Sequence, residues 1–137
     1  MEILNNFSLK NYNTFGIEAK AEQFVAVHSV SELKSILEQN KNQKKFVLGG
    51  GSNMLLTKNI EALVIHIDLK GKKILKEDAD FVWVESQAGE NWHQFVLWAI
   101  DQNFGGLENM SLIPGNVGTT PVQNIGAYGA EIKDFFI

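Results

Sequence analysis

A triple glycine at the end of a short apolar strand is the feature that most constrains this chain. Lys45 to Leu48 has the composition of a buried strand, and the loop Gly49 to Met54, with the sequence GGGSNM, follows it directly. Glycine lets the backbone turn so that successive amides point into one concavity, which suits an anion such as a pyrophosphate. Ligands of open α/β sheets bind beyond the carboxyl ends of strands. The segment therefore predicts an anion-binding loop, with a tight turn between strands as the alternative.

The residues before this loop predict a strand, a helix and a second strand. Phe24 to His28 favours a strand, and Ser29 lies three residues before Glu32, which is the spacing of a capping box. Apolar residues then recur at helical spacing until a polar stretch ends the helix. Residues 24–48 thus form a predicted βαβ unit, whose right-handed crossover favours parallel pairing of its two strands.

The second half of the chain predicts further strands and one main helix. Runs that favour strands occupy Ala62 to Ile67, Ile74-Leu75 and Phe81 to Ser86. Aromatic and aliphatic residues recur at helical spacing from Asn91 to about Gln102, and we expect Gly105-Gly106 to stop this helix. The expected fold class is α+β.

A second glycine-rich segment, Gly106 to Gly129, is long, irregular and neither charged nor merely polar. Loops of this kind are usually functional. Pro114-Gly115 sets a turn, and the amides around Gly118 and Thr119 are candidate anion donors if a short helix begins there. The alternative is an ordered connection with hydrophobic anchors.

The charge and composition of the chain narrow the range of ligands. A formal net charge of -4 without a basic block disfavours nucleic acid or an anionic membrane as a partner. All twelve basic residues are lysines, so phosphate binding must rely on backbone amides and hydroxyls. The lack of cysteine excludes disulfides, thiolate metal sites and a cysteinyl-linked flavin. No apolar run approaches the roughly 20 residues of a spanning helix and no signal peptide is recognised, so we expect a cytoplasmic protein.

Five motifs lie along the chain in a characteristic order and spacing. They are Asn13 to Gly16, Gly49 to Asn53, Ala88 to Trp92, Gly106 to Glu108 and Ile113 through Glu131. Each motif alone is weak, but the ordered set is specific. Together they resemble the N-terminal, FAD-binding part of the UDP-N-acetylenolpyruvoylglucosamine reductase (MurB) family, and the resemblance covers essentially the whole chain.

This resemblance implies the α+β FAD-binding fold of the vanillyl-alcohol oxidase and p-cresol methylhydroxylase type, with FAD held non-covalently between two subdomains. Residues 1–68 are expected to form the first subdomain, which contains the βαβ unit and the pyrophosphate loop. Residues 69–137 are expected to form the second, an antiparallel sheet with helices. We expect this second subdomain to be incomplete, because the apolar end Phe135 to Ile137 looks like the opening of a strand in a C-terminally truncated chain.

The resemblance also implies which residues meet the cofactor and the substrate. The pyrophosphate of FAD is assigned to Gly49, Gly50, Gly51, Ser52, Asn53 and Met54. The flavin and the phosphates are assigned to Ile113, Pro114, Gly115, Val117, Gly118 and Thr119. The edge of the isoalloxazine ring is assigned to Val122, Asn124, Ile125 and Gly126, and the substrate side to Tyr128. A β-branched residue at position 51 is expected to obstruct the loop and weaken FAD binding.

The implied activity is the reduction of UDP-N-acetylglucosamine enolpyruvate by NADPH through FAD, in peptidoglycan precursor synthesis for the bacterial cell wall. The family's catalytic serine, arginine and glutamate belong to motifs that do not occur here, so no catalytic residue is assigned and the fragment alone is expected to be inactive. His28, His66 and His93 are interpreted as ordinary strand or helix residues, and no metal site is expected. The parent protein is expected to be a monomer.

Two alternative functions stay open. The first is the FAD-binding subunit or domain of another oxidoreductase of the same superfamily. The second is a non-catalytic nucleotide-binding or protein-interaction domain that keeps the glycine loop without a redox role. Affinity for FAD separates both flavin hypotheses from the last one.

Overall fold

The computed structural model describes residues 1–137, which divide into two units, Met1–Leu69 and Lys70–Ile137. The boundary expected from the sequence lies one position earlier, between residues 68 and 69. Each unit has its own strands and its own hydrophobic core. No helix of the structure combines the length and the apolar character that crossing a bilayer requires.

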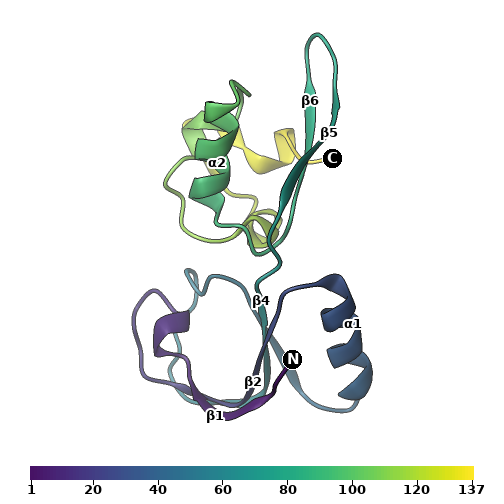
Figure 1. Cartoon of the computed structure of the whole chain (residues 1–137). Coiled ribbons are helices and arrows are strands. Elements are labelled where there is room, and N and C mark those ends of the chain that lie inside the picture. Colours follow the sequence, from purple (N-terminus) through teal and green to yellow (C-terminus); the bar gives the residue numbers. More distant parts are fainter. The chain divides into compact units, whose positions relative to one another are not determined.

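The first unit is built on a four-stranded sheet with the strand order β1-β2-β4-β3 (Figure 1). β1 (Leu4–Ser8) pairs antiparallel with β2 (Lys20–Val27), and β4 (Ile60–Ile67) pairs parallel with both β2 and β3 (Lys45–Leu48). The strands predicted in this part of the chain are present, although β2 and β4 begin earlier than expected. The glycine loop therefore leaves the carboxyl end of a strand in a parallel part of the sheet.

The strands on either side of the first helix do not pair with each other, which corrects the expected βαβ pairing. β4 lies between β2 and β3 and forms hydrogen bonds with both. Leu63, Val64 and Ile65 of β4 each have 0% exposed surface. A strand this apolar on both faces is typical of the middle of a sheet, where neighbouring strands also flank both of its edges. The crossover still delivers parallel strands, but to positions separated by β4.

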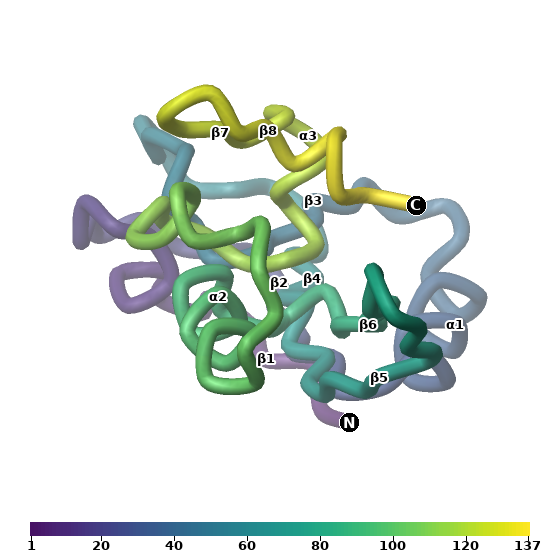
Figure 2. The backbone as a smooth tube through the Cα atoms, turned by 90° about the horizontal axis from the view of Figure 1, so that it is seen from above, coloured from purple at the N-terminus to yellow at the C-terminus, as the bar shows by residue number.

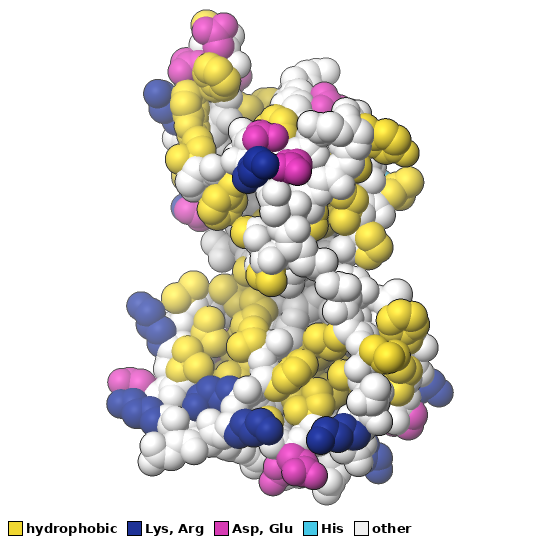
Figure 3. All heavy atoms as spheres, turned by 180° about the vertical axis from the view of Figure 1, so that it is seen from behind, with side chains coloured by type: hydrophobic (Ala, Val, Ile, Leu, Met, Phe, Trp, Pro, Cys, Tyr) yellow, Lys and Arg dark blue, Asp and Glu magenta, His cyan; other side chains and the backbone are white.

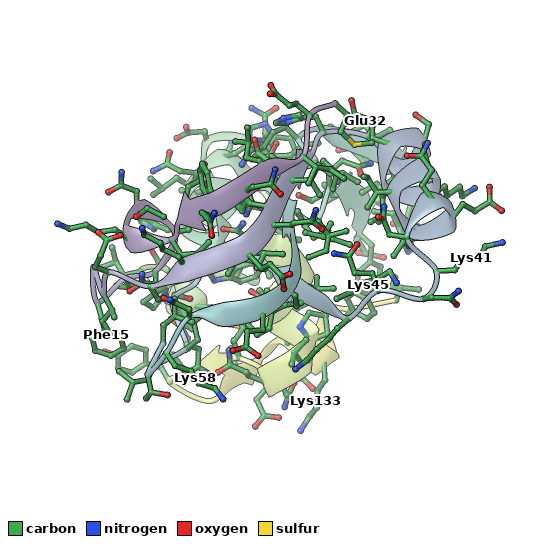
Figure 4. All side chains as sticks on the ribbon, turned by 90° about the horizontal axis from the view of Figure 1, so that it is seen from below. Phe15, Glu32, Lys41, Lys45, Lys58 and Lys133 are labelled. Carbon is green, nitrogen blue, oxygen red and sulfur yellow. The ribbon has the colours of Figure 1, made fainter.

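α1 (Val30–Gln39) begins at the predicted cap and covers one face of this sheet. The Ser29 hydroxyl oxygen accepts a hydrogen bond from the Glu32 amide at 3.2 Å, and the Glu32 carboxylate accepts one from the His28 amide at 2.7 Å. At the other end of the helix, the Asn40 side-chain amide donates to the Ile36 carbonyl at 2.9 Å, and the Lys45 ammonium donates to carbonyls of the turn that follows (Figure 4). Both ends of the helix are thus closed by side chains.

Alternation along the central strands divides the core of the first unit between the two faces of the sheet. Val25 packs against Ile36 of α1 on one face. Phe24 and Val64 point to the other face, where residues of the segment 9–21 cover them. This segment contains the first of the five motifs, Asn13 to Gly16, so the fold that completes the core also brings that motif to the glycine loop.

The second unit combines two short antiparallel hairpins with one main helix. Its strands are β5 (Lys72–Glu77), β6 (Val82–Ser86), β7 (Gly126–Ala127) and β8 (Ala130–Glu131). Its helices are α2 (Trp92–Asp101) and the short α3 (Thr120–Gln123), which leads into β7 (Figure 2). Single turns of 3-10 helix are η1 (Lys10–Tyr12) in the first unit and η2 (Glu108–Met110), η3 (Val117–Thr119) and η4 (Ile132–Asp134) in the second. The core gathers around Trp92, Phe95, Val96, Met110 and Ile132.

α2 ends before the two glycines that were expected to stop it. Asn103 adopts a left-handed φ of 60°, and the Phe104 amide donates to the Ala99 carbonyl at 2.9 Å, which closes the helix. Asparagine is one of the few residues that tolerates this conformation, so it replaces glycine here. Gly106 has a different task, because a Cβ at this position would lie 2.7 Å from the ring of Phe135.

The β5–β6 hairpin is an arm with exposed apolar side chains. Ile74 and Phe81 are 45% and 68% exposed, and the Lys76 ammonium lies 4.3 Å from the centre of the Trp83 ring. Figure 3 shows hydrophobic side chains along this arm and acidic side chains at its tip. Two-stranded ribbons are marginally stable on their own. Contacts such as that between Lys76 and Trp83, and the packing of Val84 on the core, therefore matter for the arm.

Gly51 has a structural task that precedes any ligand. Its φ is 64°, and a Cβ at this position would lie 2.0 Å from the carbonyl oxygen of Tyr12. A β-branched residue, expected from the sequence to obstruct a ligand, would first push the loop away from the Tyr12 backbone. A loss of FAD binding in such a variant would therefore not locate the phosphate site.

We predict that Gly51→Ala lowers the free energy of unfolding by more than about 2 kcal/mol, measured by urea denaturation. Gly16→Ala is the matched control, because Gly16 has a similar φ of 62° and no atom within 4 Å of an added Cβ. This control should lose only about 1 kcal/mol, the strain of a left-handed alanine. Equal losses in the two variants would contradict the close contact at Tyr12.

Candidate functional site

The motif Asn13 to Gly16 forms a rigid turn in the first unit. The Asn13 side-chain amide donates to the carbonyls of Leu9 and Ile17 at 2.8 and 3.0 Å, and its oxygen accepts from the Ile17 amide at 3.0 Å. Because Asn13 is only 7% exposed, these three bonds fix the turn from inside. The turn leaves the ring of Phe15 67% exposed at its tip (Figure 4).

The glycine loop is docked on this turn through main-chain groups. The Gly51 carbonyl accepts hydrogen bonds from the Thr14 amide at 3.1 Å and from the Thr14 hydroxyl at 3.5 Å. In contrast, the amides of Gly50, Gly51 and Ser52 donate no hydrogen bond within the chain. Gly50 and Asn53 are exposed. Three neighbouring amides without internal partners are what an anion-binding loop requires.

The second glycine-rich segment uses its amides differently. A short helix does begin near the predicted place, but the Val117 and Gly118 amides donate to the carbonyls of Glu90 and Ala88 at 2.8 and 2.9 Å. The Thr119 amide donates to the Asn116 carbonyl at 3.0 Å. These amides already have partners, so in this structure they are not available as the anion donors that the sequence analysis considered. Their bonds instead pair residues 115–118 with residues 88–92.

Close approach explains the glycine at position 118. A Cβ there would lie 2.5 Å from the Cβ of Ala88. The Trp92 amide donates to the Gly115 carbonyl at 3.0 Å, and an isolated bridge joins Asn91 to Asn116. Two backbones that approach this closely leave room only for small residues, so packing explains the glycine at position 118 whether or not a ligand binds there.

Glu90 fastens this paired region to the start of β5. Its carboxylate accepts from the Gly71 amide at 2.7 Å and forms an ion pair with the Lys72 ammonium at 3.1 Å. Burial alone would raise the pKa of Glu90, but the Gly71 hydrogen bond and the nearby Lys72 charge outweigh it, so the pKa lies below its ordinary value of 4.5. The Lys70 ammonium also donates to the Gly89 carbonyl.

The residues assigned to the flavin edge lie on α3 and the β7–β8 hairpin. Tyr128, with a φ of 52°, and Gly129 form the turn between the strands, and the Tyr128 ring is 91% exposed. Val122 is 82% exposed, which leaves it accessible to a ligand. Asn124 is less available, since its side-chain oxygen accepts from the Lys133 amide and its nitrogen donates to the Glu131 carboxylate, both at 3.2 Å.

Three residues near the assigned sites have features that the sequence did not reveal. Leu112 has a left-handed φ of 64° and a side chain that is 75% exposed. His93 contacts the backbone amide of Leu112 with its ring. Phe15 is the exposed ring beside the glycine loop. Only Phe15 lies inside a matching motif, and nothing in the spacing of His93 and Leu112 indicates that they meet.

An apolar cavity of about 230 Å³ in the second unit is distinct from the assigned residues. β6 and α2 contribute Val84, Trp98 and Ser86, whose buried hydroxyl has no hydrogen-bond partner. Of the residues assigned to FAD, only Val117 lines it. The cavity therefore does not define the candidate site.

The three histidines have separate surroundings. The His28 ring lies 3.3 Å from the Asp68 carboxylate, and the His66 ring packs edge-on against Tyr12 at 5.1 Å. No three metal-ligating side chains converge in the structure. The indole of Trp92 is buried and donates to the Met110 carbonyl at 2.8 Å, as expected for a core anchor.

One known protein family matches most of this chain. Residues 21–136 match the family described as FAD binding domain. The chain belongs to the FAD binding domain family. The α+β FAD-binding fold expected from the sequence is thereby confirmed.

The curated proteins similar to this chain share one name, which is that of a reductase. It is 84% identical over 137 residues to the UDP-N-acetylenolpyruvoylglucosamine reductase of Flavobacterium johnsoniae, of which it covers 41%. It is 50% identical over 131 residues, 94% of this chain, to the Pseudomonas putida reductase, of which it covers 39%. The crystal structure of MurB from Thermus caldophilus is 26% identical with a TM-score of 0.70, over 97% of this chain and 45% of that one. The resemblance inferred from the motifs is confirmed, and the chain spans about 40% of the length of these curated relatives.

We predict that Glu90→Gln lowers the free energy of unfolding at neutral pH by about 1–2 kcal/mol, because it removes a charge-assisted pair that is largely buried. In the native chain this stabilisation is present above the ordinary pKa of 4.5 and is lost as the pH falls through the lower folded pKa. Urea denaturation below pH 4.5 should therefore show a weaker pH dependence in the variant. Glu85→Gln is the control: its pair with Lys73 is exposed, so less than about 0.5 kcal/mol is expected. Identical acid profiles of native chain and Glu90→Gln would rule out this role.

Proposed function

We propose that this chain forms the FAD-binding part of a UDP-N-acetylenolpyruvoylglucosamine reductase. The observation that carries the proposal is the set of three amides, at Gly50, Gly51 and Ser52, that donate no hydrogen bond within the chain although the loop itself is firmly docked. The relatives' name supplies the reaction, and the FAD binding domain family supplies the cofactor.

The first unit fits the diphosphate of FAD without a cationic side chain. The chain has no arginine, so bidentate guanidinium contacts are absent from it. Amides of a left-handed turn at Gly51 provide a local positive potential that suits an anion. Ser52 and Asn53 add polar side chains at the same place, and Gly49 and Met54 continue the loop. We assign the diphosphate to these six residues.

The second unit is assigned to the flavin ring and the substrate. Exposure supports Val122 and Tyr128 in these roles, since both side chains are accessible. Ile113, Pro114 and Gly115 are assigned to the flavin through a loop that α2 holds by hydrogen bonds. The amides of Val117, Gly118 and Thr119 are already used in hydrogen bonds within the chain. These residues would therefore contact the cofactor through the side chains of Val117 and Thr119 or through backbone carbonyls.

FAD bound by these residues would supply hydride transfer from NADPH to the enolpyruvyl double bond of the substrate, and a proton donor elsewhere in the full-length protein would complete the reduction. This chain's residues would bind and orient the cofactor, and we assign no catalytic residue to them. We also infer that the parent protein acts as a cytoplasmic monomer in peptidoglycan precursor synthesis. These inferences rest on the family resemblance of the sequence, and the relatives' name supports only the reductase assignment.

Titration of FAD into the cofactor-free full-length protein, followed by flavin fluorescence, tests the proposal. Ser52→Pro removes one amide donor, and Ser52→Ala removes only the hydroxyl. We expect Ser52→Pro to weaken binding by about tenfold or more and Ser52→Ala by less than about threefold, provided circular dichroism shows both variants folded. A folded Ser52→Pro variant that binds FAD as tightly as the native protein would show that the diphosphate does not bind at this loop. No affinity in the native protein would favour the non-catalytic alternative.

We predict that the 137-residue chain, even when supplied with FAD, does not oxidise NADPH in the presence of UDP-N-acetylglucosamine enolpyruvate. We expect the full-length protein to do so, because the family motifs that carry the catalytic serine, arginine and glutamate do not occur in this sequence. Absorbance of NADPH reports the reaction in both samples. Sustained turnover by the chain alone would show that it contains catalytic groups that we have not assigned.

A further inference from the structure

The first turn of α2 holds the loop 110–115 through its side chains. The Leu112 amide donates to Nδ1 of His93 at 3.2 Å, and the Ser111 hydroxyl oxygen lies 3.0 Å from the same nitrogen. In this arrangement Nδ1 of His93 is the acceptor for the Leu112 amide. The neighbouring Trp92 adds two bonds, from its indole to the Met110 carbonyl and from its amide to Gly115.

Leu112 shows why the loop needs this support. A left-handed φ costs a residue with a side chain about 1–2 kcal/mol, and Leu112 has a φ of 64°. Its side chain is 75% exposed, so burial returns little of that strain. The conformation must therefore be imposed by the bonds around it. Strain that the surroundings hold in place is typical of ligand-binding segments.

The strained residue immediately precedes Ile113, Pro114 and Gly115, which are assigned above to the flavin. If Leu112 relaxed to a right-handed or extended conformation, the direction of the chain at Ile113 would change. The bond from the Leu112 amide to His93 opposes that relaxation. A loop already held in its binding conformation loses less entropy when it meets a ligand.

We propose that His93 is a positioning residue for the flavin: its Nδ1 holds the Leu112 amide and so presents Ile113 to Gly115 to bound FAD in a fixed conformation. The inference rests on the proposed function. It gives a specific role to a histidine that the sequence analysis interpreted as an ordinary helix residue. His93 does not itself need to touch the cofactor.

Two substitutions separate the acceptor from the bulk of the ring. His93→Asn places an amide oxygen near the position of Nδ1 and keeps an acceptor, whereas His93→Phe keeps a ring and loses the acceptor. Gln94→Phe is the matched control, because Gln94 is an exposed residue of the same helical turn. FAD affinity and the absorption spectrum of the bound flavin are measured for each full-length variant, and urea denaturation reports its stability.

We expect His93→Phe to weaken FAD binding by roughly three- to tenfold, the range of one lost hydrogen bond, and to alter the flavin spectrum. His93→Asn should restore most of the affinity, and Gln94→Phe should bind as the native protein does. Native affinity and spectrum in His93→Phe would overturn the proposal. So would an equal loss in His93→Asn and His93→Phe, since the acceptor would then be irrelevant.

Hydrogen exchange of the Leu112 amide keeps this test separate from the test of the proposed function. His93→Phe should accelerate exchange at Leu112 whether or not FAD is present. Unchanged exchange would overturn the bond itself. If the native protein binds no FAD but Leu112 still exchanges faster in His93→Phe than in the native protein, the loop contact is real but has no role for a flavin. The failure would then belong to the proposed function.

Discussion

The docking of the glycine loop on the backbone of residues 12–14 is the contact on which the candidate site of the first unit depends. Asn13 fixes the turn with three side-chain bonds, and Thr14 then donates to the Gly51 carbonyl. The Tyr12 carbonyl lies where any side chain at position 51 would have to begin. The loop is held through the Gly51 carbonyl, and the amides of Gly50, Gly51 and Ser52 donate no hydrogen bond within the chain. Rigidity and an open set of donors therefore come from the same arrangement.

The two glycine-rich segments look alike in sequence but use glycine for different purposes. The first has three neighbouring amides without partners in the chain, whereas the second uses its amides to pair with residues 88–92. Composition cannot separate these cases. Whether an amide is available depends on which distant carbonyl reaches it, and that is decided by the tertiary fold.

Local features of the chain could be predicted from the sequence, and non-local ones could not. The Ser29 cap, the strands expected between residues 24 and 86, and α2 each depend on neighbouring residues and are present in the structure. The strand expected to open at Phe135 is absent, because the chain turns there after the single helical turn η4. The central position of β4 depends on burial on both faces, which its unbroken apolar run indicates only indirectly. α2 ends at Asp101, close to the expected Gln102, but Asn103 rather than Gly105-Gly106 stops it, because asparagine and glycine compete for the same backbone conformation. The contact between His93 and Leu112 joins residues 19 apart, and no local rule connects them.

The narrow gap between Ala88 and Gly118 has a consequence for changes to this protein. Because the methyl group of Ala88 already occupies the space that a side chain at 118 would enter, neither position can grow unless the other backbone withdraws. The segments 88–92 and 115–118 thus form a matched pair across the sequence. Anyone transplanting one of these loops from a homologue into this scaffold would have to transplant its counterpart as well.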